Sequence, residues 1–195
     1  DALSNSWIGV TNADNPLYNP KGYMVFVRGD RSVTSYNQLA NKTTLRIKGT
    51  LLTGSLPPIS VLPDKWESIG NPYASPVDFT LITKSAGVDD KFYVWDPHLY
   101  GSYGLGGYQT LSSSNDWEPV PGGTATYPTG IPCKTIQSGQ AFFVRATPIH
   151  ALLPATYTIT FTENCKAGSS SSFNFARYQG QESTVSQRQY LRASL

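Results

Sequence analysis

Few side chains in this sequence could support hydrolysis, and they form no recognised catalytic motif. The two histidines, His98 in WDPHLYG and His150 in TPIHALLP, lie in neither a G-x-S-x-G nor an H-E-x-x-H pattern. His98 lies beside Asp96 and near Ser102, but catalytic triads are assembled in space and not along the chain. We therefore expect His98 to be a loop residue, and we predict no catalytic residues.

Paired carboxylates are the second candidate for chemistry. A glycosidase needs two carboxyl groups about 5–10 Å apart across a cleft, and the candidates are Asp89, Asp90 and Asp96, or Asp116 and Glu118. No spacing selects one pair, and Asp89-Asp90 fits a turn before KFYVW. The D-x-D-x-D-G calcium loop is missing. The sequence predicts a chain that is not an enzyme, with no cofactor and no metal site, and leaves adventitious calcium binding open.

Aromatic residues in and near a glycine-rich stretch are the best candidates for ligand binding. GSYGLGGY (101–108) fails the register of a dinucleotide fingerprint, and no Lys-Ser/Thr follows it. It fits a mobile loop that carries tyrosines, whose rings can stack on sugars or contact a protein partner. Trp95 is a further candidate for this surface, with a place in the core as the alternative because FYVW is strand-like. The predicted ligand-binding residues are Tyr100, Tyr103, Tyr108 and Trp117.

The two cysteines, Cys133 and Cys165, are too few to form a disulfide framework. The neighbouring strands, GQAFFVRA and TITFTE, could form a hairpin that brings the two flanks together. We therefore expect a Cα separation below about 7 Å and a disulfide between them. Two independent buried thiols are the alternative.

Composition predicts short strands joined by turns as the elements that position these side chains. The chain has 195 residues, a net charge of +2 and 14% charged residues, which gives no basic face for nucleic acid. Aromatic residues make up 12%, and abundant Ser, Thr, Gly and Pro favour strands and turns over helices. No apolar run reaches the roughly 18 residues of a membrane-spanning helix. No signal peptide begins at Asp1, so we expect a mature or excised piece.

Two similar segments predict an all-β fold with two related halves. GYMVFVRGD and GQAFFVRAT share Gly, Phe, Val and Arg at matching offsets, and such near-continuous apolar runs are typical of strands covered on both faces. The alternating segments TLRIKGTL and TYTITFT follow them, with the period of half-exposed strands. We predict a β-sandwich or jelly roll of antiparallel sheets with long loops. The repeat covers residues 22–51 and 139–162.

NPYASPVDF predicts the start of one short helix near 75–86. Ser75 fits the N-cap, and Asp78 would fall at the third helical position, where its charge meets free backbone N–H groups. Gly87 can end the helix in a left-handed conformation. Asn71, which precedes a proline, would close the preceding strand as a turn. On this interpretation the stretch is a corner of the fold, and Asp78 is a capping carboxylate.

The chain divides into a predicted module, 1–166, and a tail. AGSSSSF begins a linker-like segment, 167–185, and RQYLRASL predicts a terminal strand in 186–195. That strand would begin a following domain or act as an assembly strand, and its pairing in cis or in trans is left open. Its apolar contacts would come from Tyr190, Leu191 and Leu195.

An ordered set of motifs resembles an extracellular β module of Bacteroidota cell-surface proteins. The motifs are WESIGNPYASPVDF, FYVWDP with a Gly/Tyr loop and GGYQT, IQSGQAFFVRA, and TITFTENCK, over roughly residues 20–195. Modules of this kind look like non-catalytic parts of large proteins exported by type IX secretion. The resemblance implies an extracellular or cell-surface location. Cys133 and Cys165 are not part of the family pattern.

The residues and the resemblance together favour a non-catalytic extracellular module with a structural, adhesive or assembly role in a larger surface protein or fibre. Its partners would be other surface-protein domains, copies of itself or glycans, and no nucleic acid. A carbohydrate-binding module that uses the loop aromatics is the alternative function. An exposed row of aromatic rings would favour sugar binding, whereas exposed strand edges or an open apolar groove would favour assembly.

Overall fold

The computed structural model contains nine short strands and three one-turn 3-10 helices within the residues that it describes. Those residues are 8–12, 14, 16–17, 20–25, 32, 48–96, 99, 106–119, 127, 130–148 and 156–168. The strands are β1 (Ile59–Val61), β2 (Trp66–Gly70), β3 (Val77–Asp78), β4 (Thr83–Lys84), β5 (Lys91–Asp96), β6 (Gly107–Ser112), β7 (Thr135–Ile136), β8 (Ala141–Arg145) and β9 (Tyr157–Thr160). The 3-10 helices are η1 (Phe79–Leu81), η2 (Ser113–Asn115) and η3 (Glu163–Cys165). None of the helices in these residues is long and apolar enough to cross a membrane.

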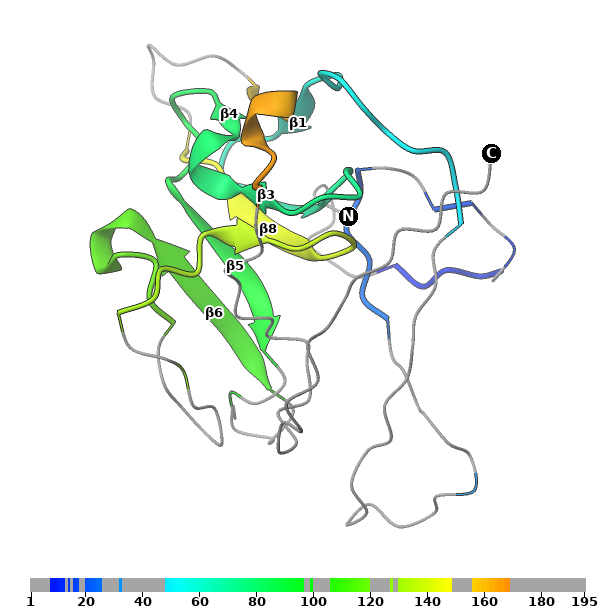
Figure 1. The fold of residues 1–195 in the computed structure, drawn as a ribbon, viewed down its shortest axis with the longest axis horizontal. Helices are drawn as coiled ribbons and strands as arrows, with labels where there is room; N and C mark the ends of the chain where they lie inside the picture. The colour runs from blue at the N-terminus through cyan, green and yellow to red at the C-terminus, as the bar shows by residue number, and fades with distance from the viewer. Residues whose placement is uncertain are drawn as a thin grey trace.

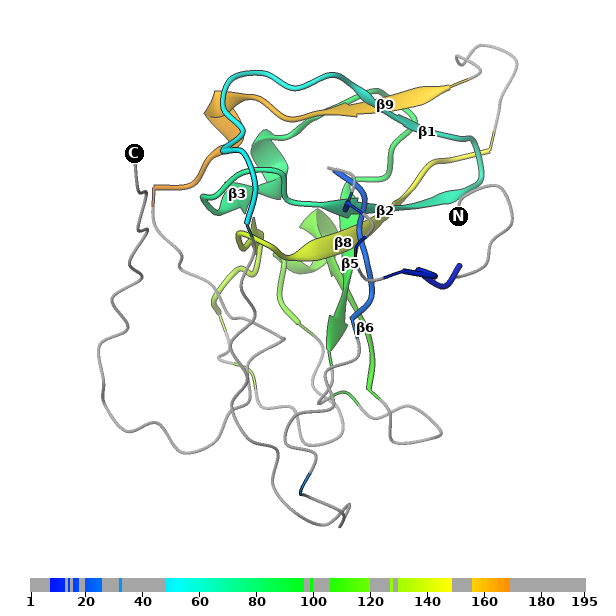
Figure 2. The ribbon, with the colours of Figure 1, turned by 90° about the vertical axis from the view of Figure 1, so that its right-hand side faces the viewer.

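The strands form three antiparallel sheets around one core. The largest sheet has the order β2-β8-β5-β6, the second has the order β1-β9-β4, and β3 pairs with β7 in the third. β1 and β9 form a layer above β2 and β8, and the β5–β6 hairpin runs away below them (Figure 2). Figure 1 shows that hairpin as the long ribbon at one side of the fold. The predicted all-β fold of antiparallel sheets is confirmed.

Because side chains alternate along the strands, one face of a sheet points toward the core. In β9, Tyr157 and Ile159 are buried, and Phe161 continues the same row. This is the inward set that the period of TYTITFT predicts. Phe142 and Val144 of β8 are buried in the same way. The period therefore identifies the buried face of β9, whereas GQAFFVRA, predicted as a strand covered on both faces, has one buried face and one partly exposed face in β8.

The two halves of the predicted repeat differ where the structure describes them. Gly139 has a φ of +73° in the turn before β8, a conformation that favours glycine. Gly22 instead lies in an extended segment along the edge of β2, where its N–H donates to the Ser68 carbonyl at 3.0 Å. A Cβ at Gly22 would lie 2.1 Å from Ser68 Oγ, so close packing is what requires this glycine. Most of the first half, between 26 and 47, lies outside the described residues.

The segment predicted as a helix near 75–86 forms β3, the single turn η1, and β4. Backbone groups of β3 are already paired with β7 on one side and with Lys166 on the other, so they are not available to a helix. Asp78 does cap, but it caps η1: its Oδ1 accepts a hydrogen bond from the Thr80 N–H at 2.9 Å. The expected cap at Ser75 is wrong, since its Oγ is buried and has no hydrogen-bond partner.

The predicted hairpin between GQAFFVRA and TITFTE does not form, and neither does the disulfide. β8 lies between β2 and β5, whereas β9 lies between β1 and β4 in another sheet. Cys133 and Cys165 flank opposite sides of β3, because Val77 pairs with Ile136 on one side and with Lys166 on the other. Two strand spacings of about 4.8 Å each separate those flanks, beyond the reach of a disulfide. Both cysteines are free buried thiols.

Candidate binding face

The outer face of the β2-β8-β5-β6 sheet carries aromatic side chains on every strand. The register places Trp95 opposite Tyr108 and Phe143 opposite Tyr93, so these rings share one face. Trp66 of β2 belongs to the same face, since it pairs with Arg145 two positions beyond Phe143. We name this surface the aromatic face. Its members are Trp66, Tyr93, Trp95, Tyr108 and Phe143.

The rings of the aromatic face contact one another edge to face and remain accessible to solvent. Ring centroids lie 5.0 Å apart for Trp95 and Tyr108, 5.5 Å for Tyr108 and Phe143, and 4.6 Å for Trp66 and Tyr93, with interplanar angles of 65–90°. Trp66, Trp95 and Tyr108 are 39%, 38% and 40% exposed. Such pairs contribute about 0.5–1.5 kcal/mol beyond burial, so each ring helps to fix the orientation of its neighbour.

Around the rings, the outward positions of the four described strands have small, hydroxyl and paired charged side chains, and none of these positions has an aliphatic side chain larger than alanine. Arg145 Nη2 lies 2.6 Å from Asp64 Oδ1, and Lys91 Nζ lies 3.4 Å from Asp89 Oδ2. The hydrogen bond to Asp64 raises the pKa of Arg145, and the charge of Asp89 raises the pKa of Lys91. Both cations are therefore locally balanced. The non-aromatic outward positions are Ser68, Gly70, Lys91, Thr110, Ser112, Ala141 and Arg145.

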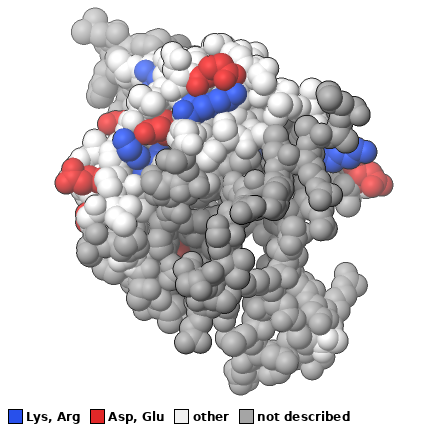
Figure 3. Space-filling view, in the orientation of Figure 1, with Lys and Arg blue, Asp and Glu red and all other residues white. Residues whose placement is uncertain are grey.

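The described surface in the view of Figure 3 has the same mixed charge. Basic and acidic atoms lie beside one another there, and no broad patch of one sign is visible among the described residues. The ion pairs Lys84–Asp90, at 3.6 Å, and Lys134–Asp78, at 3.2 Å, also place a positive charge beside a negative one. Nothing on this surface resembles the basic stripe expected of a nucleic-acid-binding protein.

A buried polar cluster lies on the inner side of the β5–β6 hairpin. Asp96 and Gln109 are each 1% exposed. The Tyr127 hydroxyl donates a hydrogen bond to Asp96 Oδ2 and accepts one from Gln109 Nε2 at 2.8 Å. Buried polar groups need such partners, and these bonds tie Tyr127 to the hairpin. Asp96, a candidate catalytic carboxylate from the sequence, is a hydrogen-bond acceptor inside the protein.

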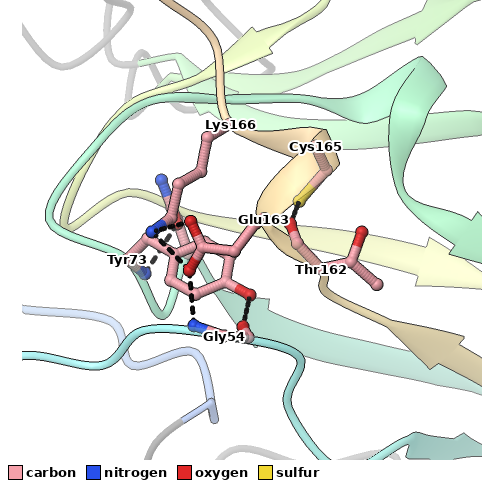
Figure 4. Close-up of polar contacts among 7 residues, drawn as sticks. Gly54, Tyr73, Thr162, Glu163, Cys165 and Lys166 are labelled. Atoms are coloured by element: carbon pink, nitrogen blue, oxygen red, sulfur yellow. Dashed lines mark hydrogen bonds and ion pairs between the residues drawn. The ribbon is translucent and has the colours of Figure 1, made fainter.

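A second polar cluster fastens the segment around Gly54 to η3 (Figure 4). The Glu163 carboxylate accepts a hydrogen bond from the Gly54 N–H and lies 2.7 Å from Lys166 Nζ. The Tyr73 hydroxyl donates to the Gly54 carbonyl at 2.5 Å, and Lys166 Nζ lies 4.3 Å from the Tyr73 ring centroid. The hydrogen bonds from Lys166 and Gly54 lower the pKa of Glu163. The cluster acts as a clamp between two segments far apart in sequence.

The two thiols have the properties of structural cysteines. Cys165 Sγ donates to the Thr162 carbonyl at 2.9 Å (Figure 4). Burial raises the pKa of the Cys165 thiol, and burial raises the pKa of Cys133 to about 11. Since the thiolate is the nucleophile and the metal ligand, neither cysteine is activated for chemistry at neutral pH.

The corner after β2 is held by one buried amide, Asn71. Its Nδ2 donates to the carbonyl oxygens of Ser75 at 2.9 Å, Gln137 at 3.1 Å and Ile136 at 3.2 Å. Its Oδ1 accepts a hydrogen bond from the Tyr73 N–H at 3.0 Å, which closes a local turn. Asn71 is 7% exposed. The geometry of NPYASPVDF is that of a corner whose polar groups are used to join two parts of the backbone.

The structure separates the four predicted ligand-binding residues. Tyr108 lies on the aromatic face. Trp117 is 8% exposed and stacks on Phe92 with centroids 5.9 Å apart, so its assignment as a ligand-binding residue is wrong. The cause is backbone at positive φ, 53° at Asp116 and 61° at Trp117, which turns the chain back over the core. The predicted residues outside the described part of the chain are Tyr100, Tyr103, Tyr190, Leu191 and Leu195.

Sequence reasoning does not find most of the aromatic face. It leaves Trp95 open between the binding surface and the core, and the structure turns this side chain outward. In both FYVW and AFFV, aromatic or aliphatic residues occupy every position, so a period of two cannot distinguish the inner face from the outer face. The signal that resolves it is the pairing of Tyr93 with Phe143, which joins strands far apart in sequence.

Metal chemistry and comparison with known proteins give few further leads. Within the described ranges, no cluster of three or more His, Cys, Asp or Glu side chains could hold a metal ion.

No curated protein and no solved structure matches the chain significantly. One family model, described as a domain of unknown function, matches residues 2–193. Because this match spans nearly the whole sequence, the chain belongs to the DUF8693 family, a domain of unknown function.

Proposed function

We propose that the chain is a non-catalytic extracellular module that binds a partner through its aromatic face, with an adhesive or structural role in a larger surface protein. The aromatic face is the observation that supports this most. A sheet with one face in water usually alternates apolar residues inward with polar residues outward. Here β5 and β8 carry aromatic rings on both faces. Aromatic residues are enriched at interaction surfaces, so a group of partly exposed rings on one face favours a binding role.

The size of the face fits a reversible contact. Trp66, Trp95 and Tyr108 each expose about two fifths of their surface. Aromatic side chains of this type bury about 150–250 Å² each, so the three expose on the order of 250 Å² together. Covering that area yields roughly 6 kcal/mol at 25 cal/mol per Å², before the costs of association are subtracted. This favours a module that binds and releases its partner.

The positions of the motifs support a scaffold role for the rest of the chain. WESIGNPYASPVDF covers β2, the Asn71 corner and β3, and the AFFVR of IQSGQAFFVRA forms β8. Three of the five carboxylates that could have served a hydrolase have structural partners: Asp89 and Asp90 pair with lysines, and Asp96 is buried beside Tyr127. The extracellular location rests on the resemblance to Bacteroidota surface modules exported by type IX secretion.

A panel of immobilised partners tests the proposed function. The partners are neutral and anionic polysaccharides, extracellular matrix proteins and the chain itself, with binding followed by surface plasmon resonance. We expect at least one partner to bind the native chain. This binding should be lost when Trp66, Trp95 and Tyr108 are replaced by serine. Leu81→Ser is the matched control, because Leu81 is 54% exposed on η1, on the core side of the sheet.

Two results would count against the proposed function. The first is binding that survives the triple substitution in a protein with an unchanged melting temperature. The second is the lack of binding to every member of the panel. Loss of binding in Leu81→Ser as well would show that the effect is not specific to the aromatic face.

A further inference from the structure

We infer that the aromatic face binds the chains of neutral polysaccharides. This inference rests on the proposed function, because it names the partner of the same surface. It places the sugar-binding residues on the outside of a sheet and not in the loop that the sequence favours.

The spacing of the rings is the first argument. Each strand contributes at least one ring: Trp66 from β2, Phe143 from β8, Tyr93 and Trp95 from β5, and Tyr108 from β6. The centroids of the paired rings lie 4.6–5.5 Å apart, close to the length of one sugar residue in an extended polysaccharide. Because these rings stand at 65–90° to one another, a polysaccharide lying across the strands would contact some rings by their faces and others by their edges.

The composition of the face is the second argument. The inner face of the same sheet combines aromatic residues with large aliphatic ones such as Ile69, Val94 and Leu111, as protein packing usually does. The outward positions of the four strands have aromatic rings and hydroxyl groups without large aliphatic side chains, and Thr110 is an exposed hydroxyl next to the rings. Ring faces contact the C–H groups of a sugar, and hydroxyl groups bond with its hydroxyls. This combination fits a sugar better than a second packed sheet.

The charge of the face is the third argument, and it separates neutral from anionic ligands. Both cations on the outer face have a carboxylate partner, at 2.6 Å for Arg145 and at 3.4 Å for Lys91. Recognition of an anion needs cations that can turn toward it. The phenol of Tyr108 is protonated at neutral pH and can donate a hydrogen bond, and burial raises its pKa further. The face offers hydrogen bonds without net charge.

The mutual contacts of the rings are the fourth argument. Edge-to-face packing holds Trp95, Tyr108 and Phe143 against one another, and Arg145 lies 5.9 Å from the ring centroid of Trp66. Side chains held before binding lose little conformational entropy when a ligand arrives. Such pre-organisation offsets the small binding energy of each single sugar.

Affinity electrophoresis and calorimetry with defined polysaccharides test the inference. The neutral probes are mixed-linkage β-glucan, xylan and galactomannan, and polygalacturonate is the anionic probe. We expect the native chain to bind at least one neutral probe, independently of salt, and not to bind polygalacturonate. The double variant Trp95→Ala, Tyr108→Ala should weaken binding at least about tenfold. Leu81→Ala, exposed on the other side of the core, should bind as the native chain does.

A second variant keeps the test decisive if the double variant does not fold. Thr110→Glu leaves every ring in place and puts a charge beside Tyr93, its direct partner across the strands. Thr110 is exposed, so we expect a folded protein with the same loss of binding. Equal binding by this variant and the native chain would overturn the inference.

The outcomes separate this inference from the proposed function. Binding of polygalacturonate alone, or binding to neutral probes that the folded variants retain, overturns the sugar-binding inference. If no polysaccharide binds, but the native chain sediments as a dimer and the double variant does not, the sugar-binding inference fails. The proposed function then stands, with a second copy of the chain as the partner. If neither polysaccharide binding nor association is seen, and no other partner binds, both fail.

Discussion

Replacing Asn71 by aspartate should destabilise the protein strongly at neutral pH, although the shape of the side chain hardly changes. The amide nitrogen of Asn71 faces the carbonyl oxygens of Ser75, Ile136 and Gln137. An aspartate oxygen at that place cannot donate and would face three acceptors. The two amide hydrogens of Asn71 serve the three carbonyls, so at least two hydrogen bonds are lost, at about 1 kcal/mol each. The Gln137 carbonyl keeps the Gln140 N–H as a donor, and a single carbonyl left without a partner adds roughly 1–3 kcal/mol. We expect a total loss of about 3–5 kcal/mol.

The loss of stability in Asn71→Asp should become smaller at low pH, because the protonated carboxyl group can donate one hydrogen bond. The neutral form of the new carboxyl is favoured in the fold, so its pKa there should exceed the unfolded value of about 3.9. A group with a raised pKa in the folded state binds more protons than in the unfolded state between these two values. The penalty is therefore complete above the folded pKa and declines as the pH falls toward the unfolded pKa.

Urea unfolding at several pH values, followed by tryptophan fluorescence, measures this loss. Trp117 is buried against Phe92 and should report on the core. Asn71→Ala is the control, since it removes the same donor without adding a titrating group. The stability that this variant loses should not depend on pH. A penalty below about 1 kcal/mol for Asn71→Asp at neutral pH, or one that changes with pH no more than that of Asn71→Ala, would refute the reasoning.

Three more outcomes follow from the packing and the ionisable groups. Gly87→Ala places a Cβ 1.9 Å from the buried ring of Tyr157, so its urea midpoint should drop by an amount equivalent to about 3 kcal/mol; a midpoint equal to that of the native chain would contradict this packing. Glu163 has a lowered pKa, so Glu163→Gln should lower the melting temperature at neutral pH, and the difference from the native chain should vanish as the pH falls through that pKa; a constant difference would rule out the ion pair. Cys133 and Cys165 should react with an alkylating reagent only in urea, and rapid labelling of the folded chain would show that the thiols are accessible.

The sequence predicts the elements whose side chains alternate in type. TYTITFT has Thr on one phase and Tyr157, Ile159 and Phe161 on the other, so the period alone identifies β9 and its buried face. It also indicates the corner at Asn71, because asparagine before proline favours a turn. These features depend on neighbouring residues and need no knowledge of distant partners.

Features that depend on distant pairing could not be predicted. The residues around Ser75 carry the start signals of a helix, but β7, far along the chain, takes the backbone groups of β3. Chain order indicates a hairpin of β8 and β9, but each inserts between two other strands in a separate sheet. The aromatic face is hidden from the sequence for the same reason. Its rings acquire a common side only when β5 meets β8.

The order in which the strands are made has a consequence for synthesis. β8 is the strand partner of β2, and β9 is the partner of both β1 and β4. Apart from the contact of β2 with the segment at Lys21 and Gly22, these early strands therefore lack their described strand partners until the last part of the described chain has been synthesised. Among the described strands, only β5 and β6 follow each other directly and pair. Pairing over such separations costs loop entropy and is slow. The β2-β8 and β1-β9-β4 pairings of a growing chain can therefore be completed only when β8 and β9 have been made, so the described fold should form late in synthesis.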